Sequence, residues 1–195
     1  MAVTKEAIIK ASLDILNRDG ISKLTMRALA KELNIKAASL YWHIKDKQDL
    51  YDLIAEHINQ EITLPKTSDD AKETLTTFAL DIRRVLLKTR DAVEIMASSF
   101  PSTPSRINGI KFLLDVLTKY GIPNKNCLIA ANIINNYVLS FVADEIRAKN
   151  ISKHFSPEEI KQFGLIFGEQ YETNLDFEQQ FLYGLRVILA GLLVE

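Results

Sequence analysis

The sequence predicts an all-α fold, and three observations support this. Apolar residues recur at three- and four-residue intervals along nearly the whole chain, as on one face of a helix. No segment alternates apolar and polar residues between turn signals, as a half-buried strand would. The one long break, LPKTSDD at 64–70, is rich in Pro, Ser and Asp and divides the chain. We therefore expect one domain over residues 1–63 and a larger helical domain over 64–195.

The N-terminal domain is expected to hold three helices and a fourth that leads out of it. The expected helices cover residues 4–19, 25–33, 36–43 and 46–62. Thr4, Thr25 and Asp46 stand where an N-cap side chain accepts free backbone N–H groups. Gly20 follows the first helix, and Asn34 tolerates the left-handed conformation that ends the second.

The second domain is expected to consist of six helices separated by short Pro-, Gly-, Ser- and Asn-rich stretches. The expected helices cover residues 70–89, 91–99, 105–120, 124–149, 157–170 and 175–194. Cys127 is the one cysteine of the chain and lies in the apolar run CLIAANII. It therefore cannot form an internal disulfide, and its neighbours predict a buried structural thiol.

Composition argues against several classes of protein. A hydrophobic fraction of 47% and a charged fraction of 25% are ordinary for a folded soluble protein. Charges recur through the first twenty residues, so no secretory signal is expected and a cytoplasmic location is. His43, His57 and His154 form no metalloprotease motif, and no glycine-rich loop could cradle a phosphate. We expect no enzyme, no cofactor and no metal site, and the apolar runs are too short or too interrupted to span a membrane.

A basic segment stands out in a chain whose net charge is −1. Between residues 23 and 47, six basic side chains face two acidic ones, so the local charge is +4. Such an island is the electrostatic signature of a phosphate-binding surface, although a solvated helical face would look the same. The expected helices at 25–33 and 36–43 are joined by a short turn, as in a helix-turn-helix. Ala30 is small where they cross, and Leu40 is expected to face the core.

The stretch KLTMRALAKELNIKAASLYWHIKDKQDLYDLIAEHI at 23–58 resembles the DNA-binding domain of the TetR family of transcriptional regulators. KTRDAVEIM at 88–96 and QQFLYGLRVILAGL at 179–192 are similar to the tetracycline-repressor branch of that family. The resemblance implies a homodimeric repressor that a small-molecule effector releases from operator DNA. The alternative is a helical adaptor that binds a protein and no specific DNA, which leaves the basic helix-turn-helix unexplained.

The family pattern assigns nine residues to double-stranded DNA. Arg27 would reach a guanine edge or a phosphate, and Ser39 a base or a phosphate. Tyr41, His43 and Lys47 would contact phosphates and fix the register of the protein on the duplex. The nine residues are Thr25, Arg27, Lys36, Ala37, Ala38, Ser39, Tyr41, His43 and Lys47. Trp42 is instead expected to be half-buried against the helix at 46–62.

The resemblance also implies an effector site in the second domain. In the tetracycline-repressor branch a histidine helps to bind drug-chelated magnesium, and Met96 stands at its position here. Asp144 falls close to a carboxylate of that metal site, but one carboxylate without the histidine makes a poor metal site. We therefore expect no response to magnesium-tetracycline. An apolar pocket is expected among Phe78, Ile82, Leu86, Met96, Phe100, Leu113, Leu117, Ile134, Tyr137, Val138 and Phe141. The same residue types also build ordinary cores, so plain core packing remains the alternative.

Two runs, 127–142 and 181–194, are apolar around most of their circumference, more than a monomer of this size buries easily. The second carries two glycines seven residues apart, which permit close helix approach. We expect a two-fold, four-helix interface between two copies of the chain. Its expected residues are Ile129, Ile133, Asn136, Phe181, Gly184, Leu185, Ile188, Gly191 and Leu192. Such a dimer would place the two DNA-contacting helices at two half-sites of the duplex. These half-sites would lie roughly 34 to 36 Å apart, which is one turn of the DNA helix, or a multiple of that distance.

Overall fold

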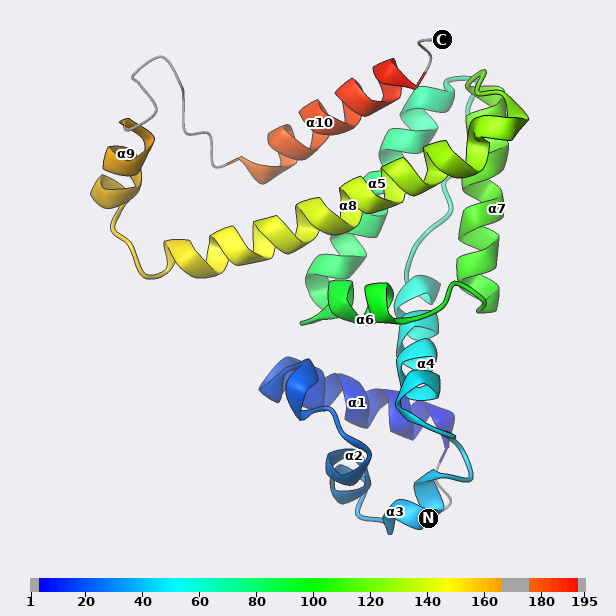
Figure 1. The fold of residues 1–195 in the computed structure, drawn as a ribbon, viewed down its shortest axis with the longest axis vertical. Helices are drawn as coiled ribbons and strands as arrows, with labels where there is room; N and C mark the ends of the chain where they lie inside the picture. The colour runs from blue at the N-terminus through cyan, green and yellow to red at the C-terminus, as the bar shows by residue number, and fades with distance from the viewer. Residues whose placement is uncertain (1–3, 166–175, 193–195) are drawn as a thin grey trace.

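The computed structural model describes residues 4–165 and 176–192 of the 195-residue chain (Figure 1). Within these residues every regular element is a helix: ten α-helices and one short 3-10 helix, with no strand. The predicted all-α fold is therefore confirmed. The N-terminal helices form one end of the molecule in Figure 1, and the longer helices form the other.

The N-terminal domain is a compact group of short helices around a small apolar core. Its elements are α1 (Lys5–Asp19), η1 (Ile21–Lys23), α2 (Met26–Glu32) and α3 (Ala37–Leu40). The side chains at its centre are no more than 1% exposed: Ile8, Ile15, Leu16, Leu24, Leu29, Leu40 and Ile44. Full burial of such a side chain stabilises the fold by about 1.5 to 3 kcal/mol. This core holds α2 and α3 in a fixed relation to α1.

Local capping sets the ends of these helices as predicted. The side chains of Thr4, Thr25 and Asp46 each accept the backbone N–H three residues further along, at the starts of α1, α2 and α4 (Lys47–Gln60). Gly20 ends α1 with a φ of 85°, and Asn34 adopts a φ of 53° after α2. Each of the three N-cap side chains contributes about 1 kcal/mol to the stability of the fold.

The segment at 36–43 is less helical than predicted. α3 ends at Leu40, whereas a helix over 36–43 was expected, and residues 41–43 form a turn. The backbone N–H groups of His43 and Ile44 both donate to the Leu40 carbonyl oxygen, at 2.9 and 3.0 Å. Leu40 and Ile44 are both buried, so the chain must turn between them before Asp46 caps the next helix.

Helix α4 (Lys47–Gln60) connects the two ends of the molecule (Figure 1). It contacts α1 on one side, and α6 (Ala92–Ser98) and α7 (Pro104–Lys119) on the other. Its buried face consists of Leu50, Tyr51, Ile54, Ala55 and Ile58. An extended segment follows and leads into α5. Helix α4 is therefore packed against both groups of helices.

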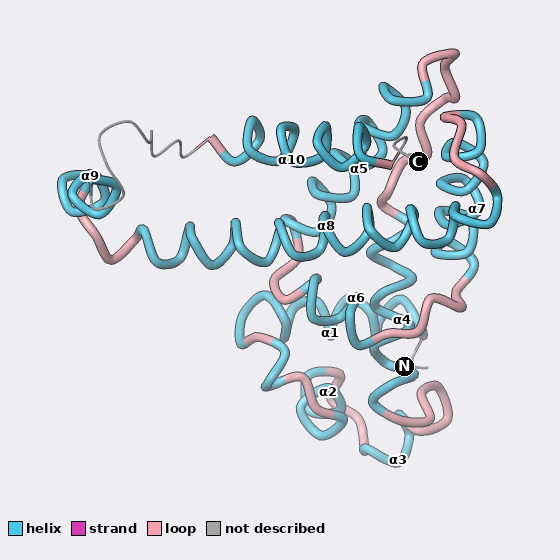
Figure 2. Tube along the Cα trace, turned by 45° about the horizontal axis from the view of Figure 1, so that its top comes forward, coloured by secondary structure: helices cyan, strands magenta, loops and turns pink. Residues whose placement is uncertain are grey.

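The second domain contains the longer helices, and its centre is apolar. They are α5 (Ala71–Lys88), α6 (Ala92–Ser98), α7 (Pro104–Lys119), α8 (Asn124–Ser152), α9 (Pro157–Leu165) and α10 (Phe177–Gly191). α8 and α10 lie side by side, and α9 lies at the outer end of α8 (Figures 1 and 2). Cys127 is 4% exposed, as predicted. The predicted ends of the helices at 157–170 and 175–194 lie partly outside the described residues.

Helix α8 is both long and apolar. Among the described helices it alone has the length and composition to cross a membrane, with a mean hydropathy of 1.3 over 18 residues. Core helices of soluble proteins pass the same test, and α8 packs against α5, α7 and α10. Only 33% of that window is buried, and the exposed residues of α8 include Leu128, Ile129 and Ile133.

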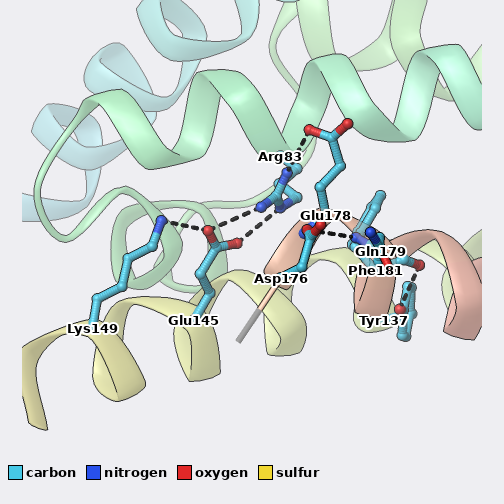
Figure 3. Close-up of polar contacts among 8 residues, drawn as sticks. All are labelled: Arg83, Tyr137, Glu145, Lys149, Asp176, Glu178, Gln179 and Phe181. Carbon is cyan, nitrogen blue, oxygen red and sulfur yellow. Dashed lines mark hydrogen bonds and ion pairs between the residues drawn. The ribbon is translucent and has the colours of Figure 1, made fainter. Parts of the chain in front are cut away.

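A buried ion pair joins α5 to α8 (Figure 3). The Glu145 side chain is fully buried and accepts two hydrogen bonds from Arg83, at 2.8 and 2.9 Å. Lys149 Nζ lies 2.6 Å from the same carboxylate. The Arg83 guanidinium also lies over the ring of Phe181 in α10, at 5.5 Å from its centroid. The pair therefore fixes three helices against one another.

Tyr137 brings α8 and α10 close together. Its hydroxyl donates to the Phe181 carbonyl oxygen at 2.8 Å (Figure 3). A Cβ atom at Gly184 would collide with the Tyr137 ring and its hydroxyl oxygen. The close approach that Gly184 permits is therefore to Tyr137 of the same chain, whereas a contact with a second copy was predicted.

Candidate nucleic-acid interface

The nine residues predicted to contact DNA lie on α2, on α3, in the turn after α3 and at the start of α4. Eight of them are exposed, and Ala37 is partly buried. No carboxylate among the described residues forms an ion pair with Arg27, Lys36 or Lys47. Lys47 Nζ instead lies 5.2 Å from the centroid of the Tyr51 ring. These cations are therefore available to an external anion.

The turn between α2 and α3 positions α3 through buried contacts. Ala30 is 4% exposed, which lets the two helices approach, and its carbonyl oxygen accepts the Ile35 N–H at 2.9 Å. Asn34 supplies the left-handed residue that the turn requires. Leu40 is fully buried and anchors the far end of α3. The first residues of α3 are thus held outward on a rigid support, as in a helix-turn-helix.

The prediction for Trp42 is wrong. Its side chain is 89% exposed, whereas burial against α4 was expected. Leu40 and Ile44 occupy the core positions on either side of it, and the turn directs Trp42 to solvent. Tyr41 beside it is 53% exposed. Two neighbouring exposed aromatic rings are unusual on a monomer surface and are typical of a binding surface.

Helix α6 is tied to the N-terminal helices at both of its ends. At its C-terminal end, Gln48 Nε2 in the first turn of α4 donates to the Ser98 carbonyl oxygen at 2.8 Å. At its N-terminal end, the Asp91 carboxylate accepts the Ile21 N–H at 2.6 Å, just after α1. Asp91 has a φ of 58°, which is uncommon for a residue with a side chain, so this bond helps to hold a strained conformation. Sequence patterns did not indicate these contacts, because they join residues 50 and 70 positions apart.

A second link joins α4 to α7. The Glu56 carboxylate accepts the Ser105 N–H at 3.1 Å and the Ser105 hydroxyl at 2.7 Å, and so caps the N-terminal end of α7. Burial raises the pKa of Glu56, but hydrogen bonds outweigh it and hold this pKa below its ordinary value. Arg106 in α7 donates to the Ser99 carbonyl oxygen at 3.1 Å. The helices α4, α6 and α7 therefore share one polar junction.

The residues predicted to line an effector pocket lie mainly in the core of the second domain. The structure buries Phe78, Leu86, Met96, Leu113, Leu117, Ile134 and Val138 to 8% exposure or less, and Ile82, Tyr137 and Phe141 partly. Phe100 is 71% exposed in the loop between α6 and α7, so it does not join them. Two surface grooves, between α5 and α10 and between α1 and α2, are lined by other residues. The effector pocket stays a prediction.

Met96 stands where the resemblance places a metal-binding histidine, and the described residues around it include no cluster of metal ligands. The Met96 sulfur accepts a hydrogen bond from Asn59 Nδ2 at 3.3 Å. Asp144 is exposed and pairs with Arg147 on the same helix. In the part of the chain that the structure describes, no three His, Cys, Asp or Glu side chains lie where they could hold a metal ion.

The residues predicted at a dimer interface divide into two groups. Ile129, Ile133, Asn136 and Gly191 are exposed, and Gly184, Ile188 and Leu192 are partly buried. Phe181 and Leu185 are at most 1% exposed and pack inside the subunit, so they cannot form the interface. They lie four residues apart on the inner face of α10. Tyr183 and Val187 lie on its outer face and are 65% and 56% exposed.

Comparison with known proteins identifies the family. Residues 8–54 match the family described as bacterial regulatory proteins, tetR family, and residues 64–195 match the tetracyclin repressor-like C-terminal domain. The chain belongs to the TetR family. It is a DNA-binding transcriptional regulator of that family, and a member of this family is not normally an enzyme.

Three proteins are similar to this TetR-family chain over 99% of its length. The class D tetracycline repressor of Escherichia coli is 29% identical over 198 residues, which cover 99% of this chain and 90% of the repressor. A structure of Streptomyces coelicolor ActR with actinorhodin aligns with a TM-score of 0.82 at 24% identity, covering 99% of this chain and 97% of that one. A structure of BioQ with its double-stranded DNA operator aligns with a TM-score of 0.76 at 26% identity, covering 99% of both chains.

Proposed function

We propose that this protein is a homodimeric repressor that binds double-stranded operator DNA and is released from it by an apolar small molecule. The observation that carries the proposal is the exposed face of the helix-turn-helix, where Arg27, Lys36 and Lys47 have no carboxylate partner among the described residues. Arg27 is suited to bidentate pairing with guanine, and the lysines to phosphates. A similar protein, BioQ, has been solved with its double-stranded DNA operator, which supports duplex DNA as the partner of this chain. A cytoplasmic location follows from the proposed action on DNA.

The proposed homodimer is supported by the outer faces of α8 and α10. Both helices expose large apolar side chains: Leu128, Ile129, Ile133, Tyr183 and Val187. In a dimer with a two-fold axis, these faces of one subunit would pack against the same faces of the second subunit. The same axis would present two recognition helices to two half-sites of the duplex. Sedimentation of wild type and of an Ile133→Glu variant tests this, since a buried charge should shift the protein to monomer.

The proposed release acts through α4. An effector that favours one position of α6 would alter the contacts of α6 with Gln48 in α4 and with Ile21 after α1. Lys47, next to Gln48, would then move relative to the partner's recognition surface. DNA binds best to the conformer in which the distance between the two α3 helices of the dimer matches the distance between the half-sites. An effector that favours the other conformer lowers the affinity for DNA, and DNA lowers the affinity for the effector by the same free energy.

The first experiment measures affinity for duplex DNA against salt concentration. The wild-type protein selects a duplex from a random-sequence library, and fluorescence anisotropy then gives its affinity between about 50 and 200 mM salt. A steep loss of affinity with salt is expected, because each phosphate contact releases counterions. A helical adaptor without DNA specificity would enrich no sequence and would show little affinity for duplex DNA across this range of salt concentration.

The second experiment tests release. Thermal-shift measurements with apolar antibiotics and metabolites, actinorhodin among them, identify compounds that stabilise the protein. Each compound that does so should also weaken binding to the selected duplex. Tetracycline with Mg²⁺ should do neither, because Met96 stands where the metal ligand is expected. A stabilising compound that left DNA affinity unchanged would contradict effector release.

A further inference from the structure

A groove of about 1050 Å³ lies on the side of the N-terminal domain, between the end of α1, η1 and α2. From the α2 side it is lined by Thr25, Ala28 and Lys31, which recur every three residues, and from η1 by Lys23. Arg90, which lies between α5 and α6, also lines it. Helices α1 and α2 lie next to each other at the end of the molecule that also carries α3 (Figure 1). We call this surface the α1–α2 groove.

The charges of the α1–α2 groove are unevenly paired. Its two carboxylates, Asp19 and Glu32, are both bound by Arg18, whose guanidinium meets Glu32 through two hydrogen bonds at 2.9 and 3.2 Å. No ion pair within the described residues involves Lys23 or Lys31, and both side chains are exposed. The lining holds four cations, Arg18, Lys23, Lys31 and Arg90, against these two carboxylates, so its net charge is +2. Among the described residues, Lys23 and Lys31 are the two of these cations that form no ion pair.

The groove is continuous with the surface proposed to bind DNA. Thr25 belongs to both, and Arg27 follows it on the neighbouring face of α2. A helix that enters the major groove lies between two phosphate backbones, one on each side. Tyr41, His43 and Lys47 are placed to meet the backbone on the α4 side. On the α2 side, the residues predicted above to contact DNA are Thr25 and Arg27, and the backbone continues past both of them.

We propose that the α1–α2 groove binds the phosphate backbone of the operator outside the bases that α3 reads, with Lys23 and Lys31 as its cationic ligands. The inference rests on the proposed binding of duplex DNA, and it adds a contact surface to it. The two lysines would increase affinity without adding base specificity, because phosphate contacts carry no sequence information. They would also make affinity depend on whether the duplex extends beyond the recognised bases, whatever the sequence of that extension.

The test compares full-length wild type with Lys23→Ala/Lys31→Ala on the duplex that wild type selects from a random library. The slope of log affinity against log salt falls by about 0.9 for each phosphate that is no longer neutralised, hence by about 3.6 when a dimer lacks four lysines. The bases preferred in a repeated selection should stay the same. On a duplex trimmed to the preferred bases, wild type and variant should bind with similar affinity.

The matched control is Lys111→Ala/Lys119→Ala, which removes two exposed lysines from α7 and changes the net charge equally. It should leave the slope unchanged. An unchanged slope in the Lys23/Lys31 variant, or an equal fall in the control, overturns the groove assignment while DNA binding itself stands. If wild type selects no duplex, the proposed function and this inference fail together. Near-identical melting temperatures of the three proteins show that the comparison is between folded states.

Discussion

Arginine has opposite environments at the two ends of this molecule. In the helix-turn-helix, Arg27 is exposed and has no carboxylate partner within the described residues. In the second domain, Arg83 is 11% exposed, and the carboxylate of Glu145 beside it is fully buried. The first arrangement costs the fold nothing and leaves a cation for an external partner. The second commits both charges to holding helices together. Substitutions should therefore separate binding from stability.

The largest expected effect is on stability, from Arg83→Met. This change leaves the buried Glu145 carboxylate with Lys149 as its one cation and should lower the free energy of unfolding by about 3 kcal/mol. Urea denaturation measures this. Arg83→Met/Glu145→Leu should recover much of the loss, because it removes both charges. The matched control is Lys149→Met, where a half-exposed lysine is lost, and it should cost less than about 1 kcal/mol. Equal losses from Arg83→Met and Lys149→Met would contradict the assigned role of the pair.

The next effect is on binding, from Arg27→Ala. Affinity for the selected duplex should fall by about 1 to 3 kcal/mol, with relaxed preference at one base pair of each half-site. The free energy of unfolding should change by less than about 0.5 kcal/mol, because the side chain is exposed. Anisotropy and urea denaturation measure the two quantities on the same protein. A loss of stability that matched the loss of affinity would remove the contrast with Arg83.

A smaller, pH-dependent effect is expected at the junction of α4 and α7. Glu56→Gln weakens the bonds to Ser105 and should lower the free energy of unfolding by about 1 kcal/mol at neutral pH. The pKa of Glu56 is lowered in the folded protein, so its contribution is present above 4.5, the ordinary value, and is lost as the pH falls through the folded pKa. Denaturation between pH 3 and 7 should show the two proteins converging in acid. A constant difference would show that the charge of Glu56 is not involved.

Trp42→Ala is expected to affect stability as little as Arg27→Ala does. Because the ring is 89% exposed, the free energy of unfolding should change by no more than about 0.5 kcal/mol. Truncation of a buried tryptophan would instead cost about 3 to 5 kcal/mol. Urea denaturation distinguishes these outcomes, and a cost near the larger figure would contradict the exposed position of the ring.

The parts of the fold that depend on neighbouring residues were predictable from the sequence. Thr4, Thr25 and Asp46 cap helices because a short side-chain oxygen reaches the next turn, and Asn34 ends α2 because it tolerates positive φ. The helix-turn-helix follows from these local rules and from buried Leu40. Trp42 was misjudged because the helical period was extended beyond Leu40, where the chain turns.

The parts that depend on tertiary contacts were not predictable in this way. Phe181 and Tyr183 are both apolar positions of one helix, and only the packing of α10 on α8 decides which faces inward. Pocket linings and cores use the same side chains, so residues such as Leu117 could not be assigned to one of them. The bond from Gln48 to Ser98 joins polar residues whose sequence neighbours give no sign of it.

The central claim is that the exposed face of α2, α3 and the start of α4 reads DNA as a two-fold dimer. Selection from a random duplex library, with wild type and Arg27→Ala in parallel, tests it most directly. The expected result is an inverted repeat for wild type, and for the variant the same repeat with one base pair per half-site no longer preferred. Identical profiles for the two proteins, or no enriched sequence for wild type, would contradict the claim.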